Sequence, residues 1–153
     1  MLALSRPYGV LHYRLDGPAD APVVVMANSL GTDLRLWDAV MPLLPAGLRY
    51  LRYDKQGHGL SDLGRADRLQ DHVDDVVALI EQVARGPVVM VGLSIGGLIA
   101  QRLASTRPDL VRALVALIEQ PDRRDTLIAR REGAIYRFDI HLQGDRETVF
   151  IDV

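Results

Sequence analysis

A serine flanked by glycines is the residue in this sequence best placed to do chemistry. Gly92-Leu93-Ser94-Ile95-Gly96 matches the pattern G-x-S-x-G; it follows the apolar run PVVMVGL and precedes the helix-like run GGLIAQRLA. Such a strand-to-helix turn lifts the serine off the end of a sheet, and the glycines remove side chains that would collide with neighbouring backbone. We predict that Ser94 is a nucleophile. The alternative is a glycine-rich turn with an incidental serine.

A serine nucleophile also needs backbone N–H groups that face the developing oxyanion. The stretch ANSLG directly follows the apolar run PVVVM, at residues 27–31. We expect the amide of Leu30 to point toward the site while Gly31 lets the chain turn. The alternative is that these residues form only a connecting loop.

The composition narrows the classes of function. The chain has 153 residues and a formal net charge of -2, with no basic block that would bind nucleic acid. Its lack of cysteine excludes disulfides and thiolate metal sites. No run of about 18 apolar residues predicts a membrane helix, and the first ten residues do not resemble a secretory leader. We therefore expect a cytoplasmic protein that binds neither membrane nor nucleic acid and needs no cofactor or metal.

The elements that must position Ser94 alternate along the chain. Apolar runs predict strands at residues 10–16, 22–28, 49–54, 87–93 and 110–117. Helical periodicity predicts helices within residues 34–44, 68–86 and 96–109, the second ending at Gly86. This order predicts an α/β fold, with a mostly parallel sheet and helices on both faces.

The pattern changes near residue 117. The polar stretch EQPDRRDT, residues 119–126, is typical of a linker. Strict alternation in AIYRFDIHLQ predicts a strand at 134–143, followed by a turn at GDRE and a second strand at 148–153. A C-terminal antiparallel β-hairpin is therefore expected.

Three stretches together resemble a known family. NSLGTDLRLWD, LRYDKQGHGLSD and VGLSIGGLIAQRLA are similar to segments of the α/β-hydrolase family, specifically the 3-oxoadipate enol-lactonases of the β-ketoadipate pathway. The resemblance covers about residues 8–116. It implies a hydrolase of small lactones or esters in which Ser94 is the nucleophile and the amides of Leu30 and Ile95 bind the oxyanion. One departure is Gln56, which stands where the family usually has arginine before G-H-G.

The resemblance also implies missing parts. Family members continue into a lid, a catalytic acid and a catalytic histidine, in the order Ser, Asp, His. This chain lacks those segments, so we expect a truncated sheet and an impaired hydrolase. With nothing beside it, strand 110–117 is expected to be an exposed sheet edge that promotes self-association.

The final residues resemble a different protein. Residues 117–153 are similar to the carboxyl tail of protocatechuate 3,4-dioxygenase alpha subunits. This likeness predicts a chimera with a hydrolase part at 1–116 and a dioxygenase-type tail at 117–153. A second functional hypothesis follows, in which the chain is a non-catalytic fusion remnant whose tail pairs with a dioxygenase beta subunit.

A catalytic base would have to come from one of four histidines. His12 lies on an early strand, far from Ser94. His58 follows a strand at the correct end of the sheet, but the resemblance implies a structural role for it. His72 is expected on the solvated face of its helix. None of these three is predicted to be the base.

The tail offers the fourth histidine. Asp139 and His141 share one face of the predicted strand and follow Ser94 in the order acid, then base. The same face carries Arg137 and Gln143, which indicates a solvated face, and the tail resemblance explains the pair without catalysis. We do not predict a rebuilt triad.

Overall fold

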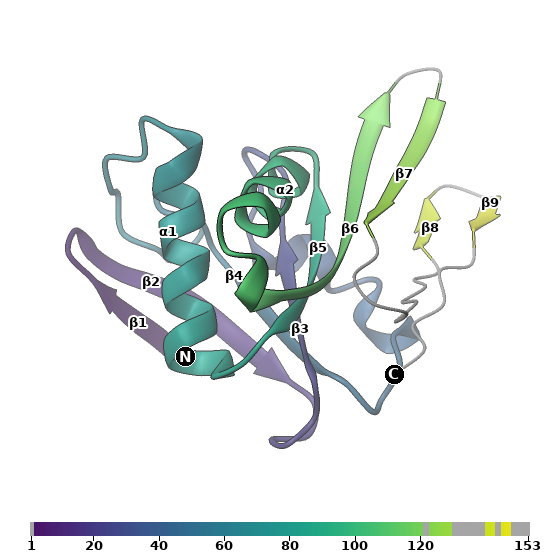
Figure 1. Cartoon of the computed structure of the whole chain (residues 1–153), viewed down its shortest axis with the longest axis horizontal. Coiled ribbons are helices and arrows are strands. Elements are labelled where there is room, and N and C mark those ends of the chain that lie inside the picture. The colour runs from purple at the N-terminus through teal and green to yellow at the C-terminus, as the bar shows by residue number, and fades with distance from the viewer. Residues whose placement is uncertain (1, 121–122, 130–139, 143–144, 148–153) are drawn as a thin grey trace.

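The computed structural model describes residues 2–120, 123–129, 140–142 and 145–147, and the side-chain surroundings of residues 2–116. Figure 1 shows a twisted sheet with two helices packed against it. The strands are β1 Leu2–Arg6, β2 Gly9–Asp16, β3 Val23–Ala27, β4 Arg49–Tyr53, β5 Val88–Leu93, β6 Val111–Gln120, β7 Arg123–Ala129, β8 Ile140–Leu142 and β9 Asp145–Glu147. The α-helices are α1 Leu69–Leu79 and α2 Ile95–Thr106.

The main sheet has a parallel centre and antiparallel edges. The strand order in the described part is β1-β2-β4-β3-β5-β6-β7. Strands β4, β3, β5 and β6 run parallel to one another, whereas β1–β2, β2–β4 and β6–β7 are antiparallel pairs. This confirms the predicted α/β fold. It places β5, which leads to Ser94, between β3 and β6.

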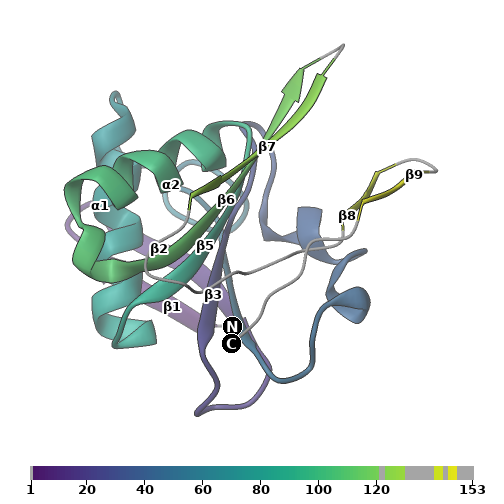
Figure 2. The same cartoon turned by 45° about the vertical axis from the view of Figure 1, so that its right-hand side comes forward.

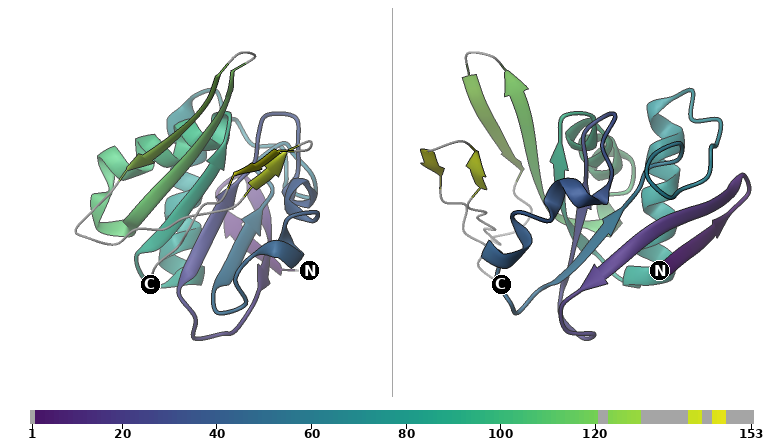
Figure 3. Two further views of the ribbon diagram at one scale, coloured as in Figure 1. Left: turned by 90° about the vertical axis from the view of Figure 1, so that its right-hand side faces the viewer. Right: turned by 180° about the vertical axis from the view of Figure 1, so that it is seen from behind.

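Both faces of the sheet are buried, which explains the nearly continuous apolar strands. Alternate side chains enter two cores: Val25 contributes to the core under α1 and α2, and Val24 to the core on the opposite face. Figures 2 and 3 show α1 and α2 together on one side of the sheet. The described cover on the other side includes Trp37 and Leu48, both almost fully buried.

The predicted helix at residues 34–44 is replaced by two short 3₁₀ turns, Leu34–Trp37 and Met41–Leu43. Pro42 explains the break, because proline has no N–H to donate and crowds the preceding turn. Helix α1 also ends differently: a π-helical turn, Ile80–Ala84, follows it, and Arg85 rather than Gly86 takes the left-handed conformation.

The carboxyl side of the sheet departs most from expectation. The predicted linker at 119–126 is wrong, because β6 continues to Gln120 and β7 pairs with it antiparallel, with Glu119 opposite Arg124. The expectation that strand 110–117 forms the sheet edge is therefore also wrong. An open edge leaves backbone N–H and C=O groups unpaired, and the next segment of chain satisfies them. Self-association through a sheet edge stays a prediction.

The tail is described only in part. Strands β8 and β9 pair antiparallel, with Ile140 opposite Glu147, which agrees with the expected hairpin. The turn predicted at GDRE is wrong, since three of these four residues, Asp145–Glu147, form β9. The predicted strand at 148–153 and residues 134–139 lie outside the described residues. No described helix is long and apolar enough to cross a bilayer.

Candidate active site

Ser94 occupies the sharp turn between β5 and α2. Its backbone has φ 54° and ψ -120°, a conformation that costs free energy for any residue with a side chain. The turn lies at the carboxyl end of a central strand, where the loops of parallel strands meet. The sequence prediction of a serine at a strand-to-helix turn is confirmed as geometry.

The glycines around Ser94 are required by close backbone contacts. A Cβ added to Gly96 would overlap the backbone oxygen of Ala27, at the end of the neighbouring strand β3. A Cβ added to Gly92 would overlap the backbone oxygen of Gly96. The G-x-S-x-G spacing therefore lets the turn fold back on itself and against β3.

The loop after β3 begins beside this turn, because Ala27 pairs in register with Gly92. The loop is internally bonded: the Asn28 side-chain amide donates to the backbone oxygen of Thr32 (2.6 Å), and the Thr32 hydroxyl donates to the backbone oxygen of Ser29 (2.8 Å). Gly31 has φ 72°, as expected for the residue that turns the chain.

The two amides predicted to bind an oxyanion both belong to this edge of the sheet. Leu30 is 66% exposed, and within the described residues its N–H has no hydrogen-bond partner. Ile95 is the first residue of α2, so its N–H has no acceptor within the helix. The geometry is compatible with oxyanion binding, and the roles of Ser94, Leu30 and Ile95 stay predictions.

A buried carboxylate lies under the same edge. Asp54, 1% exposed, follows β4 and accepts hydrogen bonds from the N–H of Leu34 (2.7 Å) and of Leu60 (2.9 Å). Its second oxygen also lies 2.8 Å from Nδ1 of His12. Sequence reasoning gave Asp54 and the following Lys55 no role; the available signal was their place directly after a buried strand.

His58 is engaged in hydrogen bonds with the loop after β3 and with its own segment. Nε2 of His58 accepts the N–H of Gly31 (3.1 Å), and Nδ1 donates to the backbone oxygen of Gln56 (3.1 Å), so both ring nitrogens are used. This agrees with a structural role for His58. The side chain of His141 lies outside the described surroundings, and Asp139 outside the described residues.

His72 corrects the sequence prediction. It was expected on the solvated face of α1, but it is 9% exposed. The reason is that α1 packs on the sheet with neighbouring positions of the helix also buried, which widens its covered face beyond the apolar stripe. Burial lowers the pKa of His72, and the positive charge of Lys55 lowers it further.

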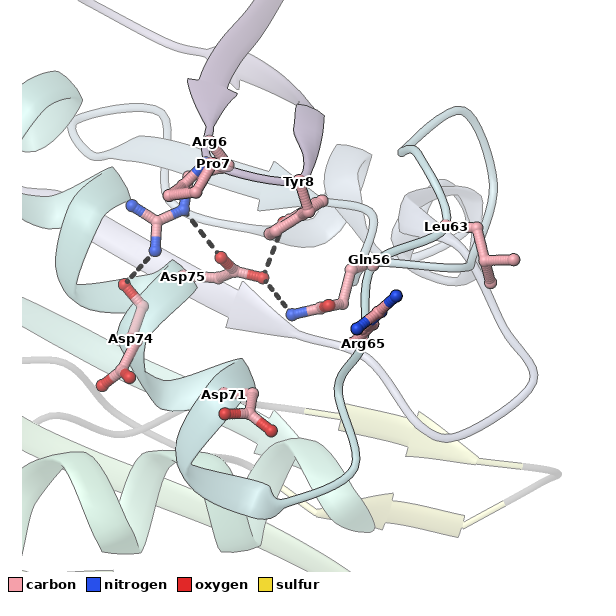
Figure 4. A pocket seen from close by; sticks show the side chains of 10 residues that line it. Arg6, Pro7, Tyr8, Gln56, Leu63, Arg65, Asp71, Asp74 and Asp75 are labelled. Atoms are coloured by element: carbon pink, nitrogen blue, oxygen red, sulfur yellow. Dashed lines mark hydrogen bonds and ion pairs between the residues drawn. The ribbon is translucent and has the colours of Figure 1, made fainter.

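Gln56 fills the place of the family's arginine. Figure 4 shows Arg6, Tyr8 and Gln56 converging on the carboxylate of Asp75, which is 1% exposed. Arg6 Nε and the Tyr8 hydroxyl each donate at 2.8 Å, and the Gln56 amide donates at 2.9 Å. Burial and the bond to Asp75 raise the pKa of Tyr8. A neutral donor thus stands in place of the guanidinium, in a cluster that joins β1, the turn after it and the segment after β4 to α1.

Residues able to hold a metal are not grouped in the described part of the chain: no cluster of three or more His, Cys, Asp or Glu side chains occurs there. The loop after β3 and the Ser94 turn bring a serine hydroxyl and the backbone amides of Leu30 and Ile95 to the same edge of the sheet. Such a site suits attack on a polarised carbonyl group.

Comparison with known proteins agrees with this geometry. Residues 22–127 match the family model described as the alpha/beta hydrolase fold. The chain is 33% identical over 100 residues to 3-oxoadipate enol-lactonase 1 of Acinetobacter baylyi, covering 65% of this chain and 38% of that protein. It is 36% identical over 110 residues to the putative carbamate hydrolase RutD of Variovorax paradoxus, covering 69% and 41%.

A solved structure gives the same result. The crystal structure of the enol-lactonase from Burkholderia xenovorans LB400 superposes with a TM-score of 0.65 and 35% sequence identity, covering 71% of this chain and 45% of that one. The chain thus spans about two fifths of the length of the curated relatives named above.

The dioxygenase resemblance of residues 117–153 finds no support in these comparisons, and the family match continues past residue 117 to residue 127. The boundary between residues 116 and 117 stays a prediction. With more than half of its length matched by the family model, the chain belongs to the α/β-hydrolase family.

Proposed function

We propose that this chain carries the nucleophile and oxyanion site of a hydrolase that acts on small carboxylic esters or lactones. Ser94 is the nucleophile, and the amides of Leu30 and Ile95 bind the oxyanion. The observation that carries this proposal is the strained backbone of Ser94, held between two glycines that admit no side chain. Strain of this kind persists where function requires it.

The reaction follows from the positions of these groups. The Ser94 oxygen forms a bond to the carbonyl carbon, and the carbonyl electron pair moves onto the oxygen that faces the two amides. Collapse of this intermediate breaks the bond to the leaving oxygen, which takes up one proton while Ser94 has lost one. In a lactone this opens the ring and leaves an acyl-serine. Water then attacks the acyl group, releases the acid and restores the serine hydroxyl.

The substrate class that we propose first is an enol-lactone. Support comes from relatives named as enol-lactonases, at 33% identity in one protein and 35% in one solved structure. A relative named as a putative carbamate hydrolase stands at 36% identity, so a carbamate is the competing substrate. Both contain a carbonyl bonded to oxygen, and the same three groups would act on either.

The proton of Ser94 has no described acceptor. His58 uses both ring nitrogens, and His12 is paired with Asp54. We therefore propose that the 153-residue chain reacts slowly with Ser94-directed probes and turns over near background. The oxyanion site and substrate binding alone retain a rate advantage of roughly 10³ to 10⁴ over water when a triad is removed.

A fluorophosphonate probe tests this function, with the labelled residue located by mass spectrometry. We expect slow labelling of the unaltered chain at Ser94 and none in Ser94→Ala. Ser105→Ala is the matched control, because Ser105 is exposed and donates only to the backbone oxygen of Arg102. Equal labelling of the unaltered chain and Ser94→Ala would refute the nucleophile assignment.

Turnover of 3-oxoadipate enol-lactone, p-nitrophenyl acetate and a simple carbamate then ranks the substrates. Substantial turnover that is lost both in Ser94→Ala and in His58→Ala or His141→Ala would show that the chain has recruited a base. That result would overturn the proposal of near-background activity.

A further inference from the structure

The loop that offers the Leu30 amide is held from one short segment of the chain. Three side chains directly after β4 reach it: Lys55 binds its first two residues, His58 binds Gly31, and Asp54 binds Leu34 at its far end. We call these three residues the anchoring segment. Leu30 lies between the anchored positions.

Lys55 is the most unusual member of the anchoring segment. It is the only lysine in the sequence, and it is 1% exposed. Its ammonium group donates to the backbone oxygens of Asn28 (3.1 Å) and Ser29 (2.9 Å), and it makes no ion pair with a described carboxylate. Burying an ammonium group costs free energy, and hydrogen bonds to carbonyl oxygens offset only part of that cost when no carboxylate pairs with it.

The bond to Ser29 acts directly on Leu30. The oxygen of Ser29 and the N–H of Leu30 belong to one peptide group, and the described chain has no cis peptide bond. In a planar trans peptide the two point in opposite directions, so fixing the oxygen fixes the N–H. The buried ammonium group of Lys55 donates a hydrogen bond to the Ser29 oxygen, and the Thr32 hydroxyl donates to the same oxygen (2.8 Å). The N–H of Leu30 is thereby directed away from Lys55.

We propose that Lys55 is a positioning residue for the oxyanion donor: by binding the carbonyl oxygens of Asn28 and Ser29, its ammonium group sets the direction of the Leu30 N–H. His58 supports the next residue through Gly31. The inference rests on the proposed function for its chemical consequence, whereas the contact between Lys55 and the loop can be tested without any activity.

The pKa of Lys55 gives a measurable sign that its ammonium group is buried against the loop. Burial lowers the pKa of Lys55 to about 8, while the neighbouring charge of Asp54 opposes that shift. The charge of Asp54 acts on the ammonium, and the ammonium acts on His72, whose pKa is lowered first by burial and then by the positive charge of Lys55. A lysine in water titrates near 10.4, so the two situations are readily separated.

The first experiment is NMR of the full chain with ¹⁵N-lysine, which gives a single side-chain signal because the sequence has one lysine. We expect titration near pH 8 and slowly exchanging ammonium protons. A side chain that titrates near 10.4 with fast exchange would overturn the contact with the loop.

The second experiment compares Lys55→Met with Gln56→Met. Both changes remove one buried polar side chain from adjacent positions, but the Gln56 side chain donates its hydrogen bond to Asp75 in α1, whereas Lys55 donates to the loop. We expect hydrogen exchange at the Gly31 and Thr32 amides to accelerate about tenfold or more in Lys55→Met only. Equal exchange in the two variants would refute the positioning role.

Rescue separates positioning from general damage. The chain has no cysteine, so Lys55→Cys can be alkylated with bromoethylamine while unfolded and then refolded, which rebuilds an amine at nearly the original distance. The rebuilt chain should regain slow exchange at Gly31 and Thr32. Failure to regain it in a folded rebuilt chain would count against the proposal.

The activity arm uses the fluorophosphonate labelling rate of Ser94. Loss of one oxyanion donor costs about 10²- to 10³-fold in comparable sites, and a misdirected donor should cost roughly tenfold or more in Lys55→Met. If the unaltered chain does not label, the proposed function fails, while the NMR results still decide whether Lys55 holds the loop. If the loop loosens but labelling is unchanged, the inference fails and the proposed function stands.

Discussion

Two turns at the same edge of the sheet are built in different ways. The turn at Ser94 is held by backbone against backbone, where Gly92 and Gly96 admit no side chain. The loop at residues 28–34 is held by side chains of the anchoring segment, which lies 20 to 27 residues further along the chain. Close backbone packing tolerates almost no added atom, whereas side-chain anchors can be weakened one at a time.

This contrast predicts where the site is fragile and where it is adjustable. A methyl group added at Gly92 or Gly96 would overlap backbone atoms of the turn or of β3. A changed anchor leaves the loop in place but loosens it, because the remaining anchors still act. Four changes of decreasing effect test this difference.

The largest effect is expected from Gly96→Ala, compared with Gly31→Ala. The added methyl group at Gly96 meets the backbone oxygen of Ala27, so the chain should lose about 4 kcal/mol or more of stability, or fail to fold. A Cβ added at Gly31 would meet no described atom within 4 Å, so only the left-handed φ of 72° opposes alanine, at about 1 kcal/mol. Urea unfolding measures both; similar midpoints would contradict the difference between the two turns.

The next effect compares two buried carboxylates, in Asp54→Asn and Asp75→Asn. Each carboxylate accepts several hydrogen bonds, and an amide would turn one acceptor into a donor, so each change should cost about 3 kcal/mol. Only Asp54 binds the loop, through the N–H of Leu34.

Hydrogen exchange at Leu34 separates the two variants. It should accelerate in Asp54→Asn beyond the change expected from the lost global stability, and it should not do so in Asp75→Asn. Equal acceleration, after allowing for the change in unfolding free energy, would show that Asp54 does not anchor the loop separately.

A smaller effect concerns pH. Folded Lys55 releases its proton near pH 8, whereas the unfolded chain holds it to about 10.4. The unfolded state therefore binds more protons in this window, so the free energy of unfolding should rise with pH, by about 1 kcal/mol between pH 7 and 9. The cost of burying the charge is fully present below pH 8 and is relieved above it.

Lys55→Met should lack this rise, and no second lysine can mask the difference. Tyrosine ionisation begins above the window, and burial raises the pKa of Tyr50 to about 12. Parallel stability curves for the two chains between pH 7 and 9 would mean that Lys55 is not a buried ammonium in solution.

The smallest expected effect is an increase in the stability of the fold. Glycine adopts φ 54°, ψ -120° with less strain than serine, and this relief outweighs its greater freedom in the unfolded chain. Ser94→Gly should therefore stabilise the fold by about 0.5 kcal/mol while abolishing labelling at residue 94. Thermal melting of the Ser94→Gly chain, with Ser105→Ala as the control variant, measures this stabilisation. A clear loss of stability in Ser94→Gly would mean that the Ser94 backbone is not strained.

The sequence by itself determined the elements whose signal is local. The runs at 22–28, 49–54 and 87–93 predicted β3, β4 and β5 within one residue at each end, because strands buried on both faces are continuously apolar. The glycine spacing around Ser94 predicted its turn, because the steric demand arises within five residues. Motif residues also sufficed to identify the family, which the family match over 22–127 confirmed.

Only the tertiary structure decided how distant segments meet. Three features leave no periodic pattern in the sequence. They are the burial of His72, the pairing of β6 with β7, and the hydrogen bonds of Lys55 and Asp54 to the loop after β3. Each depends on which strands become neighbours: β3 and β4 lie side by side, so the segment after one can anchor the loop after the other. A hydrogen bond from a side chain to a backbone oxygen is set by that spatial arrangement, and local residue patterns do not encode it.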